Sequence, residues 1–93
     1  MIQSFACAET GKIFTGTMSR RFPPGIQRTA RRKLLQLHAA TSVRDMMVPP
    51  GNRLEALKGA RTGQYSIRVN DQWRICFRWQ GADAYNVEIV DYH

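Results

Sequence analysis

The sequence contains few residues of the kinds that build disulfide frameworks, metal sites or membrane spans. Its two cysteines, Cys7 and Cys76, lie far apart with no Cys-x-x-Cys spacing, and there are only two histidines. This excludes a disulfide framework and a structural zinc site. No apolar run exceeds four residues, whereas a membrane span needs about 20. The first five residues hold neither a basic nor a long apolar segment, so we expect no secretory signal.

These absences favour a soluble, cytosolic protein that makes no contact with a membrane. A chain of 93 residues with 43% hydrophobic and 23% charged residues has a globular composition,. Its length suffices for one two-layer core. We therefore expect a single domain over residues 1–93.

Acidic residues are also scarce. Seven Asp and Glu stand against 14 Lys and Arg, which gives a net charge of +7, and eleven of the 14 cations are arginine. The planar guanidinium group matches phosphate oxygens in pairs. An excess of this size predicts a polyanionic partner, either nucleic acid, an acidic protein, or both in turn. Carboxylates are too few and too scattered for a two-metal nuclease, so no metal or other cofactor is expected.

Two helices are predicted in the first half of the chain, after a short strand in residues 1–5. The segment Cys7–Gly16 predicts a short helix, and Pro23–Gly25 opens a long one because proline is tolerated in the first turn. Ser42 is expected to cap one further turn through Met46, before a loop over Pro49–Asn52. The long helix shows one buried stripe of apolar residues three or four positions apart: Ile26, Ala30, Leu34 and Leu37.

From Arg53 onward the apolar period changes to two. A short strand around residues 54–57 and three longer alternating segments predict an antiparallel meander with one apolar and one polar face. The helices must cover the apolar face, so the predicted fold class is α+β, a twisted antiparallel sheet with N-terminal helices packed on one face. The larger apolar side chains are expected in the core or at its rim: Met46, Met47, Trp73 and Trp79.

Loop lengths fix which residues of the polar face oppose one another. A three-residue loop over Asn70–Gln72 sets Arg68 opposite Arg74. Like charges directly opposed destabilise a sheet, so this pair predicts either an anionic guest or a carboxylate partner. A five-residue loop over residues 80–84 predicts three further pairs, with Tyr92 diagonal to Arg74: Arg78 with Asn86, Cys76 with Glu88, and Arg74 with Val90.

The polar face therefore collects arginines beside an aromatic side chain, with Asp91 and His93 at the strand end. RNA is cleaved without metal when a base, an acid and cations surround a splayed nucleotide, and these residue types are present. Each residue also has a purely structural interpretation. Arginines can form a solvated face, Tyr92 can pack on the sheet rim, and a terminal histidine such as His93 is often without function. Glu55 fits a salt-bridge partner as well as a base.

Three motifs in this order resemble the HigB-type toxins of the RelE superfamily, which belong to bacterial type II toxin–antitoxin modules. The matching runs are Arg53-Leu54-Glu55-Ala56-Leu57-Lys58-Gly59, the segment Gly63 to Ile75 with its Trp73-Arg74 pair, and Val87 to His93 with Asp91-Tyr92-His93 at its end. The resemblance implies a RelE-like fold and a ribosome-dependent, metal-free endoribonuclease that cleaves mRNA in the decoding site. It also implies a HigA-like helix-turn-helix antitoxin as partner, with operator DNA bound only through the antitoxin complex.

The resemblance assigns roles to individual residues. Lys58 and Arg74 become the cations for the phosphate and the transition state, Tyr92 stacks on a base, and Asp91 and His93 become acid–base or orienting groups. Arg53, Arg68 and Arg78 are expected to bind RNA. Some members carry a histidine where this chain has Glu55. A glutamate can still serve as base, but pairing with Arg74 would lower the positive potential, which predicts a slower toxin.

Two other functions fit the same composition. ParE-like toxins share the superfamily fold and act on DNA gyrase without a nuclease site, and a plain basic nucleic-acid-binding module needs only diffuse charge. Lys58, Arg74, Tyr92 and His93 discriminate between these, because a nuclease depends on each of them and a binding module does not.

Overall fold

The computed structural model of the chain describes residues 1–92. Two α-helices come first, α1 (Ala8–Phe14) and α2 (Pro24–Ala39). Both confirm the sequence prediction, and α2 begins with proline in its first turn. The predicted stripe of α2 is buried along its whole length because its four members are all turned to the sheet,.

Three 3₁₀ turns connect α2 to the sheet and interrupt its first hairpin. Ser42 caps η1 (Val43–Met47) in a capping box with Asp45, as predicted,. The segment expected to be a plain loop contains η2 (Pro50–Asn52), and η3 (Gly59–Arg61) lies between the first two strands. The first two turns thus lead the chain from α2 to β1, and the third leads it from β1 to β2.

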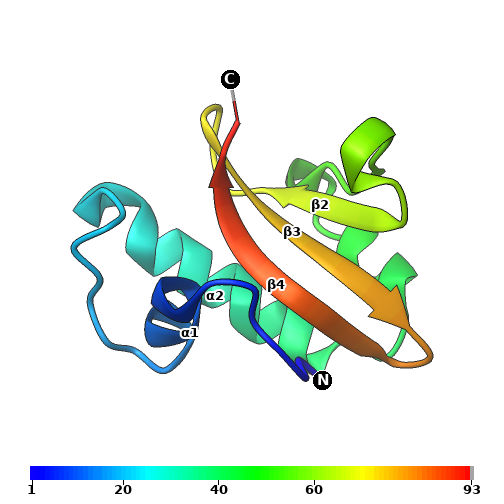
Figure 1. Cartoon of the computed structure of the whole chain (residues 1–93), viewed down its shortest axis with the longest axis horizontal. Helices are drawn as coiled ribbons and strands as arrows, with labels where there is room; N and C mark the ends of the chain where they lie inside the picture. Colours follow the sequence, from blue (N-terminus) through cyan, green and yellow to red (C-terminus); the bar gives the residue numbers. More distant parts are fainter. Residues whose placement is uncertain (93) are drawn as a thin grey trace.

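The sheet has four antiparallel strands in sequence order: β1 (Glu55–Ala56), β2 (Gln64–Arg68), β3 (Trp73–Gln80) and β4 (Asp83–Asp91) (Figure 1). The strand predicted in residues 1–5 is wrong. Instead, Ile2 and Phe5 make isolated parallel bridges to Ala84 and Val87 of β4. The N-terminal segment thus lies along β4 without forming a ladder.

The register agrees with the prediction between β2 and β3, and between β3 and β4 it differs only near the connecting loop. Arg68 lies opposite Arg74, Cys76 opposite Glu88, and Arg74 opposite Val90, as predicted. Arg78, however, lies opposite Tyr85 and not opposite Asn86. The hairpin closes by pairing Gln80 with Asp83, which leaves a two-residue loop. A bulge then restores the expected pairing, and Asn86 beside it has a left-handed φ of 53°,.

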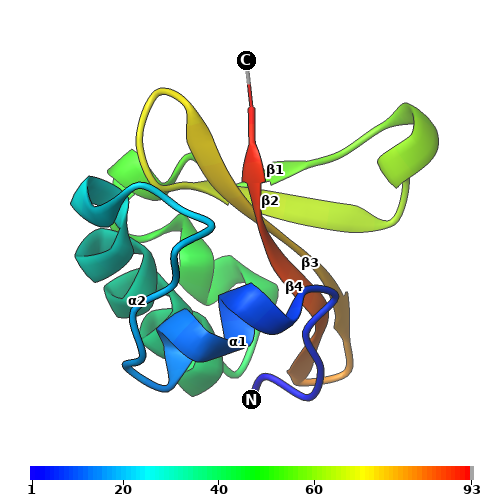
Figure 2. The same ribbon diagram turned by 60° about the vertical axis from the view of Figure 1, so that its left-hand side comes forward.

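Both helices pack on one side of the sheet, and the connection between β1 and β2 lies on the other side (Figure 2). The core between helices and sheet includes Met46, with Trp73 and Trp79 at its rim, as expected. The expectation for Met47 is wrong, since 57% of its surface is exposed. It lies at the end of a short 3₁₀ turn, whose period cannot bury adjacent side chains together.

The polar face also contains buried residues. Ser66 and Cys76 are fully buried although they belong to the polar alternation, and they lie opposite each other in β2 and β3. The helices do not cover this face, but side chains of the sheet and of the segments next to β1 bury these two residues. Within residues 1–92, no helix has the length and apolarity that a membrane crossing requires.

Candidate functional site

Arg74 is the most firmly held cation of the polar face. Its Nε donates a hydrogen bond to Ser66 Oγ at 2.8 Å, and its Nη2 donates to the Arg53 carbonyl at 2.7 Å and to the Ser66 carbonyl at 3.3 Å. Only 11% of the side chain is exposed. None of its bonds among the described residues uses Nη1. The guanidinium is thus fixed on one edge and keeps donors on the other.

The backbone around Arg53 explains how its carbonyl reaches Arg74. Arg53 ends η2 in the left-handed conformation, with φ 46° and ψ 55°. A non-glycine residue adopts this conformation only when its surroundings hold it there. The reversed peptide turns the carbonyl toward Arg74. The contact with Arg74 uses only the backbone of Arg53. Its side chain is exposed, and its role in RNA binding stays a prediction.

Three arginines of this face have an acidic partner among the described residues. Arg74 Nη2 lies 3.8 Å from Glu55 Oε1, and Arg68 pairs with Asp71. Arg61 of η3 reaches across the sheet and bonds Glu88 Oε1 of β4 at 2.9 Å. The opposed pair Arg68 and Arg74 was predicted to require an anionic guest or a carboxylate. The chain supplies the carboxylates itself.

Cys76 lies beneath this cluster. Burial raises the pKa of the Cys76 thiol, and the neighbouring charges of Arg61 and Glu88 act in opposite directions on it. The hydrogen bond to Glu88 raises the pKa of the Arg61 guanidinium. The thiol therefore stays protonated and behaves as a small apolar side chain, with Arg61 and Arg74 close enough to act on its pKa.

Tyr92 follows β4 and stands beside Arg74. The Cζ atom of Arg74 lies 5.6 Å from the centroid of the Tyr92 ring, which is cation–π distance. The Tyr92 backbone amide donates to the Gln72 carbonyl, and 38% of the residue is exposed. The structure thus brings together the aromatic and the cation that the register predicted to be diagonal neighbours.

Glu55 lies on β1 beside Arg74, and Lys58 lies in the turn after that strand. Glu55 lies opposite Ser66, accepts a hydrogen bond from the Ser66 hydroxyl at 3.5 Å, and is half exposed. Lys58 is exposed at the N-cap of η3. Arg78 is exposed farther along β3, opposite Gln64 and close to Gly63. Glu55 therefore belongs to the Arg74 cluster, as the expected pairing required.

Asp91 lies at the end of β4, on the strand position opposite Trp73. Its Oδ2 accepts a hydrogen bond from Gln72 Nε2 at 3.2 Å. It also lines a hollow of about 280 Å³ on the helix side of the sheet, together with Cys7 and Arg21. This agrees with the core-side parity of Asp91 in the sequence. His93 lies outside the described residues.

Sequence reasoning missed three residues of this site: Ser66, Arg61 and Glu88. Ser66 was visible only as a polar position in an alternating strand. Glu88 was placed opposite Cys76 by the register, but nothing in the sequence linked it to Arg61, which is 27 positions away. Among residues 1–92 no three His, Cys, Asp or Glu side chains gather as metal ligands would.

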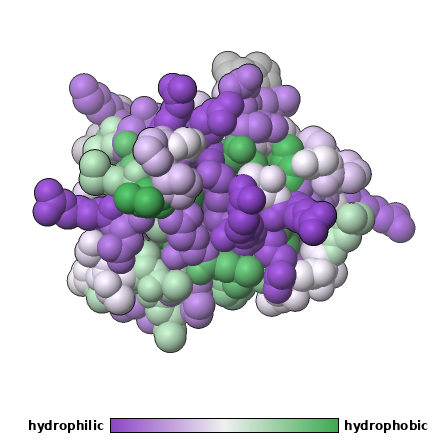
Figure 3. All heavy atoms as spheres, turned by 180° about the vertical axis from the view of Figure 1, so that it is seen from behind, coloured by the Kyte–Doolittle hydropathy of each residue, from purple (hydrophilic) through white to green (hydrophobic). Residues whose placement is uncertain are grey.

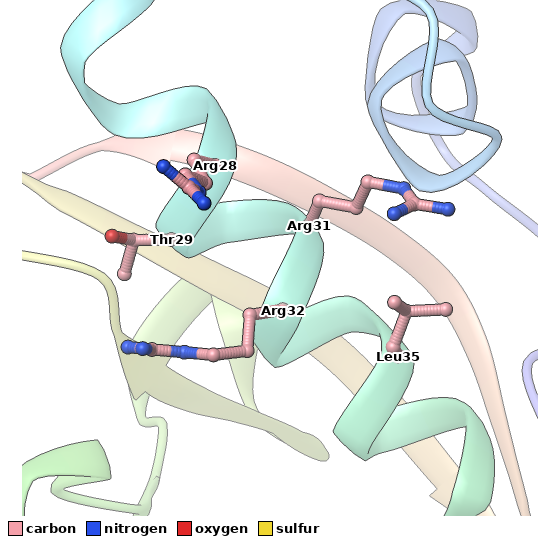
Figure 4. A pocket seen from close by; sticks show the side chains of 5 residues that line it. All are labelled: Arg28, Thr29, Arg31, Arg32 and Leu35. Atoms are coloured by element: carbon pink, nitrogen blue, oxygen red, sulfur yellow. The ribbon is translucent and has the colours of Figure 1, made fainter.

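A second group of arginines lies on α2, the helix that packs on the apolar face of the sheet. Seen from behind the view of Figure 1, the molecule shows hydrophilic side chains that project between small apolar patches (Figure 3). Arg28, Arg31 and Arg32 of α2, with Leu35, line a hollow of about 420 Å³ (Figure 4). Among the described residues none of these three arginines forms an ion pair. We call Arg28, Arg31 and Arg32 the α2 arginines.

Comparison with known proteins identifies the family. Residues 4–93 match the HigB-like toxins, described as the RelE-like toxin of the type II toxin–antitoxin system HigB. The chain belongs to this family. As a HigB-like toxin it is half of a two-protein module, and a cognate antitoxin is its partner.

Two relatives are similar to this toxin over different lengths. Toxin HigB-1 of Vibrio cholerae is 45% identical over 67 residues, which cover 72% of this chain and 70% of that protein. Endoribonuclease HigB of Proteus vulgaris is 46% identical over 41 residues, which cover 44% of this chain and 45% of that protein. The name of the second relative states its activity.

A solved structure supports the fold. The YoeB/ParE toxin from Agrobacterium tumefaciens superposes with a TM-score of 0.51 and covers 99% of this chain and 96% of that one. Its sequence is 15% identical, so the likeness concerns the fold alone. The predicted RelE-like α+β fold is confirmed.

Proposed function

We propose that this toxin is a metal-free endoribonuclease that cleaves mRNA in the ribosomal decoding site and so stops translation. A HigA-like helix-turn-helix antitoxin neutralises it, and operator DNA is bound only through that complex. The observation that carries the proposal is the Arg74 guanidinium, fixed by Ser66 and the Arg53 carbonyl beside the exposed ring of Tyr92. The endoribonuclease relative from Proteus vulgaris supports the same activity.

Strand cleavage by this route needs no group beyond the RNA and the side chains. A base takes the proton of the 2′-hydroxyl, and that oxygen attacks the adjacent phosphorus. The 5′-oxygen leaves with a proton from an acid, which yields a cyclic phosphate and a free 5′-hydroxyl. Arg74, through Nη1, and Lys58 neutralise the charge that grows on the phosphate. Tyr92 stacks on the base and holds the nucleotide splayed.

Glu55 is the proposed base. Its carboxylate lies 3.8 Å from Arg74 Nη2, so a phosphate bound by Arg74 brings its neighbouring 2′-hydroxyl toward Glu55. The ion pair also reduces the positive potential that attracts the phosphate. This combination supports a slower toxin than members with histidine at this position. The resemblance makes Asp91 and His93 acid–base or orienting groups, and the proposed acid is one of these two.

Cleavage of a defined message on purified, programmed ribosomes tests the proposal. With EDTA throughout, we expect cuts in ribosome-bound message and none in free RNA. The cut ends should carry cyclic phosphate and 5′-hydroxyl groups. Intact message at toxin concentrations that arrest growth would contradict the proposal. Inhibition of gyrase supercoiling by the same preparation would then support the ParE-like alternative.

A further inference from the structure

Helix α2 carries a buried lysine with an unusual environment. Lys33 is 8% exposed, and its Nζ donates a hydrogen bond to Asn52 Oδ1 at 2.5 Å. Burial lowers the pKa of this amine, and the nearby charges of Arg32 and Arg68 lower it further. Among the described residues Lys33 has no carboxylate partner. A buried cation bonded to a neutral amide is costly, which indicates that the contact serves a purpose other than packing.

Asn52 links Lys33 to the segment between η1 and η2, which leads to Arg53 and Arg74. It is fully buried in η2. Its Nδ2 donates to the carbonyls of Met46 and Val48, at 3.2 and 3.3 Å, and lies 3.3 Å from Gln36 Oε1 of α2. One side chain therefore fastens the chain from η1 to η2 onto the helix. The amide has its acceptor occupied by Lys33 and its donors occupied by these carbonyls.

The residue after Asn52 is Arg53, whose carbonyl holds Arg74. Arg53 has a left-handed backbone that a side-chain-bearing residue adopts only under restraint,. The Asn52 anchor immediately before it supplies that restraint. A continuous path thus runs from α2 through Lys33, Asn52 and the Arg53 carbonyl to the guanidinium of Arg74.

We propose that Lys33 and Asn52 are positioning residues for Arg74, which they orient through the carbonyl of Arg53. The inference rests on the role of Arg74 in the proposed function. The rival interpretation is that Lys33 and Asn52 only stabilise the fold. A positioning role predicts that substitution lowers the rate of the reaction step per folded molecule. A purely stabilising role predicts that it lowers only the amount of folded protein.

Helix α2 offers a matched control. Gln27 is also buried, and its side chain fastens a different loop through bonds to Ser19 and to the Phe22 carbonyl. We compare Lys33→Met with Gln27→Met in ribosome-dependent cleavage, per mole of folded protein. Misplacement of a catalytic group costs up to about 100-fold, so we expect kcat to fall about 10- to 100-fold in Lys33→Met. KM should stay within about twofold, and Gln27→Met should keep the wild-type kcat.

The loss must also depend on Arg74. In an Arg74→Ala background we expect Lys33→Met to cause no further fall in kcat, since the group it orients is gone. An equal loss of kcat in Lys33→Met and Gln27→Met, or losses that multiply with Arg74→Ala, would overturn the proposal. Should Lys33→Met fail to fold, Asn52→Asp takes its place, because it keeps the acceptor for Lys33 and removes the donors to Met46 and Val48.

A readout without RNA separates this inference from the proposed function. The Nε–H group of Arg74 is bonded to Ser66 Oγ, so its signal in heteronuclear NMR should be sharp and slow to exchange with water. We expect faster exchange in Lys33→Met and no change in Gln27→Met. An unchanged Arg74 signal in Lys33→Met refutes the positioning role. If the wild type does not cleave mRNA, the proposed function fails while this measurement still decides the inference.

Discussion

At the scale of single residues, Ser66 is the hydroxyl on which the geometry of Arg74 depends. It accepts the Nε bond at 2.8 Å and is fully buried. A hydrogen bond to a charged group contributes roughly 1.5–3 kcal/mol. Ser66→Ala should therefore reduce ribosome-dependent cleavage by about 10- to 100-fold. Rates measured with saturating programmed ribosomes check this, with Ser4→Ala on the N-terminal segment as control. Full activity in Ser66→Ala would show that Arg74 does not need this partner.

Glu55 sets the local potential in the same cluster. Because its carboxylate pairs with Arg74, we expect Glu55→His to raise the rate of messenger cleavage. The imidazole removes the competing negative charge and titrates closer to neutral pH. Glu55→Ala should lower the rate, since it removes the base as well. The pH–rate profile of all three proteins is the measurement. Equal cleavage by the wild type and Glu55→His would contradict the hypothesis of a slower toxin.

At the scale of elements, the capping box of η1 gives stability that depends on pH. Backbone hydrogen bonds from Thr41 and Ser42 lower the pKa of the Asp45 carboxyl. A lowered folded-state pKa stabilises the fold above the unfolded-state value of about 3.9, and the contribution is lost as the pH falls through the folded value.

Asp45→Asn should therefore melt below the wild type at neutral pH, and the difference in Tm should shrink toward zero in acid. Thermal unfolding followed at several pH values measures it. Asp71→Asn is the control, because Asp71 is 99% exposed in its pair with Arg68 and exposed pairs contribute little. A Tm difference for Asp45→Asn that is constant into acid would refute the account.

The elements also show how far sequence reasoning extends. The stripe of α2 and the opposition of Arg68 and Arg74 were predictable, because periodicity and a fixed loop length determine them. The pairing of Arg78 with Tyr85 in place of Asn86 was not predictable. A two-residue loop followed by a bulge gives the same pairing far from the loop as a five-residue loop does, so the sequence pattern fits both. Ser66 looked like an ordinary polar position, and the link from Arg61 to Glu88 depends on where η3 folds. The anchor of Lys33 on Asn52 joins two segments whose proximity only the tertiary fold sets.

At the scale of the whole molecule, the charge falls into two groups with different pairing. Arg61, Arg68 and Arg74 of the polar face have acidic partners, whereas the α2 arginines have none among the described residues. Like charges three and four positions apart on a helix repel each other, and a polyanion relieves that repulsion. Under the proposed function we therefore expect the α2 arginines to supply charge for association with the ribosome, and Arg74 to act on the bond that breaks.

The double variant Arg28→Gln/Arg32→Gln should therefore bind ribosomes more weakly and with a shallower salt dependence. The slope of log K against log salt falls by about one for each phosphate contact removed. The cleavage rate at saturating ribosomes should stay at the wild-type value. Binding measured over a range of salt concentrations decides this. An unchanged slope would show that the α2 arginines take no part in ribosome binding.

The central claim is that one fixed guanidinium stabilises the transition state of RNA cleavage. Its most direct test is the single-turnover rate of messenger cleavage on programmed ribosomes for the wild type, Arg74→Ala and the matched control Arg28→Ala. We predict a loss of several orders of magnitude for Arg74→Ala, and a wild-type rate for Arg28→Ala at saturation. A modest loss shared by both variants would contradict the claim, because it would make Arg74 one phosphate contact among many.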